Sequence, residues 1–394
     1  MIFDESSYVI IGNGAAGYYA ADSIRKNDKE SDIHIISEEK ILTYFRPQLS
    51  KFLGFPIDNT KFFLSPENWY KDNNINITLN KRVKKINIDN NLLLLDDGSI
   101  IGYKKLILAN GSHNFMPPLT GIDKVNVFSL RTINDAEKIK EHMSQSKNVV
   151  IVGGGLLGLE AAWSMKNVGL NVTVLEHSSR LLSRQVDEEG AKILRNSIDK
   201  TGIKIMVNAD SDELLGDKKV TGLKLKSGEI LPADIVLFST GIRPNKDLPK
   251  QSGITVDKGI IVNDRMETNA PNVYACGDVA EFNGKVFGNW PAAMNMGKVA
   301  GSNAAGAETY FKEFVPSVFF DSMNINLFSC GNFDETNEQL VSKDLSNNSY
   351  MKFYFKSDKI IGGFLIGDTK KAAQLLNAIK KGMSFDEVKT KFNL

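Results

Sequence analysis

The chain has 394 residues, of which 42% are hydrophobic and 24% charged, and its formal net charge is +1. At roughly 100–200 residues per domain this length predicts two or three domains, and the near-neutral charge argues against bulk electrostatic binding to nucleic acid or anionic lipid. The acidic N-terminus lacks the basic and apolar regions of a signal peptide, and no apolar stretch approaches the roughly 18 residues of a membrane-spanning helix. We therefore expect a cytoplasmic protein that works without nucleic acid or a membrane.

Potential metal ligands are sparse in this sequence. It contains two cysteines and four scattered histidines, namely Cys276, Cys330, His34, His113, His142 and His177. A zinc site or an iron–sulfur cluster needs several such ligands at short spacings, and none of these residues has that spacing. We expect no metal site.

A glycine-rich turn follows the first predicted strand. Residues 8–11 form a short apolar run typical of a buried strand, and residues 12–17 read G-N-G-A-A-G before a helical stretch. Gly12 permits the tight turn, Gly14 lets the backbone approach a pyrophosphate, and Gly17 lets the helix pack on the strand. Ala15 and Ala16 complete this first glycine turn, and the helix N-terminus would face the phosphates of a dinucleotide.

An acidic pair follows the second predicted strand, residues 33–36. Glu38 lies 21 residues after Gly17, at the distance where a carboxylate can accept hydrogen bonds from the ribose of a bound dinucleotide. Glu39 is the alternative. Either residue would complete the dinucleotide signature that the glycine turn begins.

The same signature recurs in the middle of the chain. The predicted strand 148–152 leads into residues 153–158, which read G-G-G-L-L-G, and then into a predicted helix. The candidate contacts of this second glycine turn are Gly153, Gly155, Leu156, Leu157 and Gly158. Glu176 follows 18 residues after Gly158, where its charge would repel the 2′-phosphate of NADPH and bind the free hydroxyl of NADH. NADH is therefore favoured over NADPH, although Arg180 could soften the preference.

Four more segments, together with the two turns, carry a family resemblance. Residues 44–51 read Y-F-R-P-Q-L-S-K, residues 109–111 A-N-G, residues 239–245 S-T-G-I-R-P-N, and residues 268–279 T-N-A-P-N-V-Y-A-C-G-D-V. Over about residues 8–330 the sequence resembles the pyridine nucleotide–disulfide oxidoreductase superfamily. Within it, the sequence is similar to the NADH:rubredoxin oxidoreductases and to the flavoprotein module of nitrite reductase.

The resemblance implies an α/β fold of the glutathione reductase type, with two Rossmann-like domains and a small C-terminal α+β domain. We expect a discontinuous FAD-binding domain at residues 1–113 and 240–312, and an NAD-binding domain at residues 114–239. The C-terminal domain, residues 313–394, should contain short strands followed by two helices, near residues 370–381 and 386–392. The lysines of the first of these helices would form a basic docking patch or an ordinary solvated face.

The resemblance also implies a set of contacts to FAD. Asp278 would accept a hydrogen bond from a ribityl hydroxyl; it could also cap a helix that starts just beyond it, and both roles can hold together. A helix that begins near Trp290 would direct its positive end at the flavin, and Trp290 itself would contact the ring or serve in packing. The remaining implied contacts are Arg46, Val83, Ala109, Gly111, Arg131, Gly241 and Gly277, of which Arg46 and Arg131 could instead be surface cations.

Lys51 and Glu160 are the implied catalytic pair. Related flavoproteins place the lysine of the R-P-x-L-S-K segment beside flavin N5, in contact with a glutamate two residues past the second glycine turn. The ammonium of Lys51 would favour negative charge on the flavin during hydride transfer, and Glu160 would hold it in place. The alternative is that the two residues lie apart, on the surface and on a helix face.

The route of electrons out of the protein follows from missing residues. Members of the superfamily that reduce disulfides or peroxides carry cysteine in the first FAD helix region, and the disulfide reductases add a C-terminal His–Glu pair. Residues 40–55 of this sequence contain no cysteine and no histidine follows His177, so the resemblance implies that disulfide and peroxide reduction through cysteine chemistry are disfavoured. We expect transfer from FAD to a small electron-transfer protein such as rubredoxin, in a monomer or homodimer. The alternatives are an NADH oxidase, a flavoprotein partner of nitrite reductase, and a redox-sensing binding protein.

Overall fold

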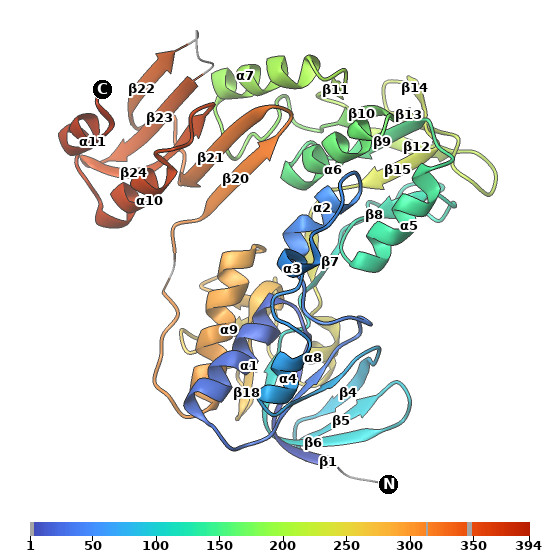
Figure 1. Ribbon diagram of the computed structural model, residues 1–394, viewed down its shortest axis with the longest axis vertical. Coiled ribbons are helices and arrows are strands. Elements are labelled where there is room, and N and C mark those ends of the chain that lie inside the picture. Colours follow the sequence, from blue (N-terminus) through green and yellow to red (C-terminus); the bar gives the residue numbers. More distant parts are fainter. Residues whose placement is uncertain (1–3, 313, 345–348) are drawn as a thin grey trace. The chain divides into compact units, whose positions relative to one another are not determined.

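We describe the protein from a computed structural model covering residues 4–312, 314–344 and 349–394 (Figure 1). The chain divides by its internal contacts into two units. Unit 1 comprises residues 1–49, 56–115 and 241–313, and unit 2 comprises residues 50–55, 116–240 and 314–394. Each unit is therefore made of three chain segments that are distant in sequence.

Unit 1 contains a seven-stranded mixed sheet in the order β3-β2-β1-β6-β5-β4, with β18 paired to β6. The strands are β1 (Asp4–Ile11), β2 (Ile33–Ile36), β3 (Ile75–Thr78), β4 (Val83–Asn87), β5 (Leu92–Leu95), β6 (Ile100–Leu108) and β18 (Val273–Ala275). Strands β1, β2, β3, β6 and β18 pair in parallel, whereas β4 and β5 form antiparallel pairs. The carboxyl end of β1 therefore carries the first glycine turn in the middle of the parallel part.

Two helices lie side by side on this sheet, α1 (Ala15–Asn27) and α9 (Trp290–Ala304) (Figure 1). Their close approach depends on Gly297 and Gly301 in α9. A Cβ atom on either glycine would lie 2.3 Å from the carbonyl oxygen of Ala16 or 2.2 Å from that of Ala20. Small residues facing one another thus hold the helix that begins at Trp290 against the helix of the first glycine turn.

The remaining elements of unit 1 are short. They are α3 (Asn59–Phe62), α4 (Asn68–Asp72), β7 (Ser112–Asn114), β16 (Ile242–Pro244), α8 (Asp247–Gln251), β17 (Ile260–Val262), β19 (Ala280–Phe282), and the 3-10 turns η1 (Arg46–Gln48) and η2 (Gly277–Val279). Strands β7 and β16 pair with each other. They flank residues 116–240, which belong to unit 2.

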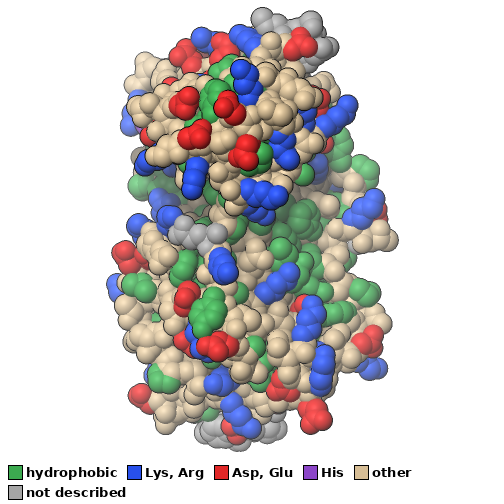
Figure 2. All heavy atoms as spheres, turned by 90° about the vertical axis from the view of Figure 1, so that its left-hand side faces the viewer, with side chains coloured by type: hydrophobic (Ala, Val, Ile, Leu, Met, Phe, Trp, Pro, Cys, Tyr) green, Lys and Arg blue, Asp and Glu red, His purple; other side chains and the backbone are tan. Residues whose placement is uncertain are grey.

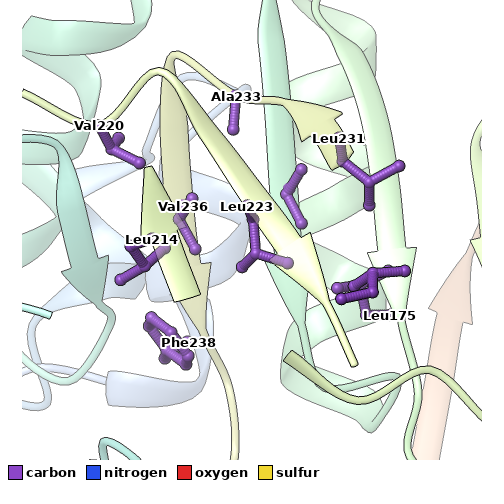
Figure 3. Close-up of a cluster of buried hydrophobic side chains, with 10 residues drawn as sticks. Leu175, Leu214, Val220, Leu223, Leu231, Ala233, Val236 and Phe238 are labelled. Carbon is purple, nitrogen blue, oxygen red and sulfur yellow. The ribbon is translucent and has the colours of Figure 1, made fainter. Parts of the chain in front are cut away.

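Unit 2 contains a second Rossmann-like sheet, all parallel, in the order β11-β10-β9-β15-β8. The strands are β8 (Val127–Ser129), β9 (Asn148–Val152), β10 (Asn171–Leu175), β11 (Lys204–Met206) and β15 (Ile235–Phe238), and the helices are α2 (Leu49–Phe52), α5 (Ile133–Met143), α6 (Leu156–Asn167) and α7 (Glu188–Asp199). Antiparallel strands β12 (Ser211–Leu215), β13 (Gly222–Leu225) and β14 (Ile230–Pro232) pack on it. Apolar side chains such as Leu214, Leu223 and Phe238 fill the space between these layers (Figure 3).

The C-terminal part of unit 2 is an antiparallel sheet in the order β20-β21-β24-β23-β22, covered by two helices. The strands are β20 (Ser317–Ser322), β21 (Ile325–Gly331), β22 (Glu338–Asp344), β23 (Ser349–Lys356) and β24 (Lys359–Ile366), and the helices are α10 (Ala372–Lys381) and α11 (Phe385–Phe392). Phe353, Leu365 and Phe392 are buried between them. The expected α+β domain and its two terminal helices are confirmed.

The surface carries charges of both signs. Over the face shown in Figure 2, lysine and arginine side chains and aspartate and glutamate side chains are both present. Among the residues described by the structure, no helix combines the length and the apolar character that crossing a membrane requires.

Candidate functional site

The first glycine turn forms an open cradle at the N-terminus of α1. Gly14 is the N-cap of α1, and no side chain caps the helix there, so the amides of its first turn are free to bind an anion. A Cβ atom on Gly14 would meet no protein atom within 4 Å, whereas one on Gly17 would lie 1.9 Å from the carbonyl oxygen of Gly12. The two glycines thus have different tasks. Gly17 serves the fold, and the open space at Gly14 fits the pyrophosphate of a dinucleotide.

Several sequence-predicted residues lie at this cradle. The carbonyl oxygen of Ala109 lies 2.2 Å from where a Cβ of Gly12 would be, and the Cβ of Ala16 lies 2.7 Å from where a Cβ of Gly277 would be. Asp278 accepts a 3.0 Å hydrogen bond from the hydroxyl of Ser112. The chain segments around residues 12, 109 and 277 therefore meet, as one FAD site requires.

The expectation of a helix just beyond Asp278 is wrong. Residues 277–279 form the single 3-10 turn η2, and β19 follows at once. The nearest helix along the chain is α9, which the side chain of Asn289 caps by accepting from the amide of Ala292. Trp290 packs edge-to-face on Phe45, with ring centroids 4.9 Å apart, so its observed contact is a packing contact.

The acidic pair after β2 separates into two environments. Glu39 accepts hydrogen bonds from the Tyr44 hydroxyl at 2.7 Å and from Arg46 at 2.5 Å, so both of its oxygens are engaged. Glu38 is largely exposed, with Arg82 3.8 Å away. The Glu38 side chain is 68% exposed and the Glu39 side chain 26%, so Glu38 is the more accessible of the two carboxylates to a ribose. Val83, next to Arg82, is buried at the start of β4.

Sequence reasoning missed a buried polar network beside the cradle. The Thr43 hydroxyl lies 2.6 Å from Oδ1 of Asn13 and 2.9 Å from the Tyr70 hydroxyl, and all three residues are buried. Asn13 belongs to the first glycine turn, and Thr43 precedes the segment expected to run along the flavin. The network therefore fixes that segment relative to the turn. The sequence did offer one signal of this network: Asn13 is polar, whereas the matching position in the second glycine turn is Gly154.

The second glycine turn repeats the geometry of the first. Gly155 is the N-cap of α6 without a side-chain cap, a Cβ on it would meet nothing within 4 Å, and one on Gly158 would lie 2.0 Å from the carbonyl oxygen of Gly153. Leu156 and Leu157 form the first turn of α6. This open, uncapped helix start fits a second dinucleotide.

Backbone amides hold the carboxylate of Glu176 in place at the end of β10. One oxygen accepts from the amide of Gly154 at 2.9 Å and the other from the amide of Ser178 at 2.8 Å. A carboxylate oxygen has room for more than one donor. Glu176 can therefore bind ribose hydroxyls without giving up these bonds, and its charge remains opposed to a 2′-phosphate.

Glu160, in α6, makes a contact that the sequence did not predict. Its carboxylate accepts a 2.6 Å hydrogen bond from the hydroxyl of Ser50. Lys51, the next residue, is exposed, and its charge acts on the Glu160 carboxyl. Burial raises the pKa of Glu160, the Ser50 hydrogen bond and the charge of Lys51 lower it, and Asp321 raises it, with a net rise. Glu160 is thus a partly buried carboxyl, and two residues of α2, Ser50 and Lys51, lower its pKa.

Arg131, Gly241 and Gly111 are three further expected FAD contacts. Arg131 belongs to unit 2, where its backbone amide donates to Asp135 at the start of α5. Gly241 opens the last segment of unit 1 with φ of 97°, and its carbonyl accepts from the amide of Phe115. Gly111 also has a positive φ, 63°. The structure describes their backbone positions, and their contacts to FAD stay predictions.

Neither cysteine is arranged for redox chemistry. Cys276 and Cys330 are free and buried, and burial raises the pKa of each thiol to about 12. A thiol of this kind is almost fully protonated at neutral pH, so it is a poor nucleophile. Within the described ranges, no three or more His, Cys, Asp or Glu side chains gather in a way that could hold a metal ion.

Comparisons with known proteins agree with this geometry. Residues 6–297 match the family described as pyridine nucleotide-disulphide oxidoreductase, and residues 316–383 match the rubredoxin NAD+ reductase C-terminal domain. The chain is 32% identical over 380 residues to NADH-rubredoxin oxidoreductase of Clostridium acetobutylicum, which covers 96% of both chains. It is 35% identical over 385 residues to a nitrite reductase of Bacillus subtilis, of which it spans about half, 48%, with 96% of this chain covered.

A solved structure also matches along its whole length. The crystal structure of NADH:rubredoxin oxidoreductase from Clostridium acetobutylicum superposes with a TM-score of 0.82 at 31% identity, over 97% of each chain. Its match extends through both Rossmann-like sheets and the C-terminal sheet.

Proposed function

Because the chain belongs to the pyridine nucleotide-disulphide oxidoreductase family, we propose that it carries electrons from NADH through FAD to a small redox protein such as rubredoxin. Family membership makes it an NAD(P)H-dependent flavoprotein oxidoreductase with FAD and NADH as cofactors. The observation that carries the choice of acceptor is the match of residues 316–383 to the C-terminal domain of rubredoxin reductases. The two buried thiols, with pKa values of about 12, further favour an acceptor outside the chain.

We assign FAD to residues 1–113 and 240–312, and NADH to residues 114–239, with residues 313–394 as a separate C-terminal domain. In the first part, the free amides of α1 would hold the pyrophosphate, Glu38 the adenosine ribose and Asp278 the ribityl chain. In the second part, α6 and Glu176 would do the same for NADH. FAD, when bound, would accept a hydride and give up its electrons one at a time.

Lys51 and Glu160 are the proposed catalytic pair. Lys51 would supply positive charge where negative charge develops during hydride transfer. Glu160, held by Ser50, would orient the nicotinamide. This division of work requires that Lys51 affect the rate of flavin reduction more than the binding of FAD.

A rapid-mixing experiment tests the proposal. The FAD-loaded protein is mixed anaerobically with NADH, and then rubredoxin, ferredoxin, oxygen or buffer is added while the flavin absorbance is followed. Fast reoxidation by rubredoxin and slow reoxidation by the other additions is the expected result. Fast reoxidation by oxygen would instead identify an oxidase, and a long-lived complex that no addition reoxidises would identify a redox-sensing binding protein.

One observation favours a second candidate. The chain is 35% identical to a nitrite reductase of which it spans 48%, so it could serve as the flavoprotein part of a larger electron-transfer system. In that case the acceptor would be a redox centre of another protein. Slow reoxidation by rubredoxin and fast reoxidation by a siroheme nitrite reductase in the same experiment would decide for this candidate.

A further inference from the structure

The C-terminal sheet carries a buried ion pair that ends on the NAD-type fold. The Nζ atom of Lys352, in β23, lies 2.8 Å from Oδ2 of Asp187, and the hydroxyl of Tyr350 donates to the same oxygen at 2.8 Å. The side chains of Lys352 and Asp187 are only 10% and 7% exposed. Although burial alone would raise it, the hydrogen bonds from Lys352, Gly190 and Tyr350 hold the pKa of Asp187 below its ordinary value. The pair is therefore an ionic contact within unit 2.

Asp187 has a second task at the start of α7. Its other oxygen, Oδ1, accepts from the amide of Gly190 at 2.8 Å, which makes Asp187 the N-cap of the helix. A buried carboxylate that loses its cation is strongly destabilised. The C-terminal sheet thus fixes the point at which α7 begins.

One chain segment connects Glu176 to Asp187. Residues 177–186, here called the ribose segment, run from the carboxylate proposed to bind the NADH ribose to the N-cap of α7. Leu181 in this segment packs against the second glycine turn, because a Cβ on Gly154 would lie 2.6 Å from its Cδ2. The ribose segment therefore touches the proposed NADH site at Leu181, and the amide of Ser178 donates to Glu176.

Other features show that the ribose segment is held rather than relaxed. Leu182 has a positive φ of 48°, which costs free energy in a residue with a branched side chain and persists only when surrounding contacts enforce it. The carbonyl of Gln185 accepts from the hydroxyl of Ser329 in β21 at 2.9 Å. The contact at Gln185, two residues before Asp187, comes from the C-terminal sheet.

We propose that the C-terminal domain positions the NADH-binding surface, and that Lys352 is the positioning residue that does so through Asp187. The inference rests on the proposed assignment of NADH to the second glycine turn. It gives the domain that matches rubredoxin reductases a role in binding the electron donor, in addition to any role with the acceptor. Because Lys352 pairs with Asp187, its effect on the proposed NADH site is indirect, and it should fall on affinity and leave the hydride transfer step unchanged.

The test is Lys352→Met in the FAD-loaded full chain, with Lys356→Met as a matched control, because Lys356 lies on the same strand and is exposed. NAD+ affinity is measured by calorimetry, and flavin reduction by stopped flow over a range of NADH concentrations. We expect Lys352→Met to weaken NAD+ binding and raise the KM for NADH about tenfold, equivalent to about 1.4 kcal/mol, with kcat, the limiting reduction rate and the FAD content unchanged. Lys352→Arg should restore the affinity.

A second variant keeps the inference testable if Lys352→Met does not fold. Tyr350→Phe removes a single hydrogen bond from Asp187 and leaves Lys352 in place, and it should weaken NAD+ binding by a smaller factor in the same direction. Unchanged NAD+ affinity in a folded Lys352→Met or Tyr350→Phe protein would overturn the inference alone. Failure of the wild-type protein to bind NAD+ would instead overturn the proposed function.

Discussion

The hydroxyl of Ser50 donates a 2.6 Å hydrogen bond to the carboxylate of Glu160, across 110 residues of sequence. The bond ties α2, which carries Lys51, to α6, which starts at the second glycine turn. Glu160 is thus held by an uncharged neighbour and leaves the Lys51 ammonium exposed to solvent. This arrangement separates the residue that positions the carboxylate from the residue that supplies positive charge.

Lys51→Ala should leave FAD bound and slow the reduction of the flavin by NADH by at least about tenfold, since charge aimed at a transition state is worth more than that in many enzymes. Stopped-flow absorbance at the flavin band measures the rate, and the protein's yellow colour after gel filtration measures retention. Lys61→Ala is the control, because the Lys61 side chain is 78% exposed. A normal rate in Lys51→Ala would clear Lys51 of a catalytic role.

Ser50→Ala should raise the pKa of Glu160 above its already raised value. Burial raises this pKa and the Ser50 hydrogen bond lowers it, so removing the bond makes the protonated form more favourable. If ionised Glu160 is needed, the rate of flavin reduction will fall off at a higher pH in Ser50→Ala than in the wild type. Rate measurements between pH 5 and 9 would show the shift, and superimposable pH profiles would argue against it.

Gly14→Ala and Gly155→Ala should separate cofactor binding from folding. A Cβ at either position meets no protein atom within 4 Å, so both variants should fold with the stability of the wild type. Gly14→Ala should lose FAD, because the new methyl group enters the proposed pyrophosphate space, whereas Gly155→Ala should keep FAD and bind NAD+ at least about tenfold more weakly. Each variant is the control of the other, and equal loss of FAD in both would contradict the assignment.

Glu176→Ala should weaken the binding of NADH more than the binding of NADPH. The carboxylate, held by the amides of Gly154 and Ser178, would no longer repel a 2′-phosphate or bind a free ribose hydroxyl. We expect the preference for NADH, as the ratio of kcat/KM values, to fall by about tenfold, the effect of about 1.4 kcal/mol. Glu141→Ala, at an exposed position in α5, is the control. A ratio that does not change would remove Glu176 from the ribose site.

Asp187 should make the protein sensitive to acid. Its pKa in the folded protein lies below the ordinary value, which is about 3.9 for an unfolded chain. Its contribution to stability is therefore fully present above that value and is lost as the pH falls through the folded-state pKa. Urea unfolding midpoints between pH 6 and 3 should fall less steeply in Asp187→Asn than in the wild type. Parallel curves would show that other carboxylates dominate.

The sequence by itself determined the local features of this protein. The two glycine turns, the strands before them, the helices after them and the helix start at Trp290 each depend on residues within about 30 positions, where periodicity and turn chemistry are decisive. The two terminal helices followed from the same kind of pattern. Asp278 shows the limit of such local reasoning. The Gly-Asp pair predicted the cap of a helix, but the chain forms only one 3-10 turn there.

Tertiary structure alone decided which partners these residues have. Ser50 reaches Glu160, Thr43 reaches Asn13, Arg46 reaches Glu39 and Lys352 reaches Asp187. Three of these four pairs join chain segments that lie 30, 110 and 165 residues apart. A side chain's hydrogen-bond partner depends on which parts of the chain pack together. From the sequence alone, the same polar residue has several possible partners. Burial selects one of these partners, because a buried carboxylate without a partner costs free energy. That burial exists only in the folded chain.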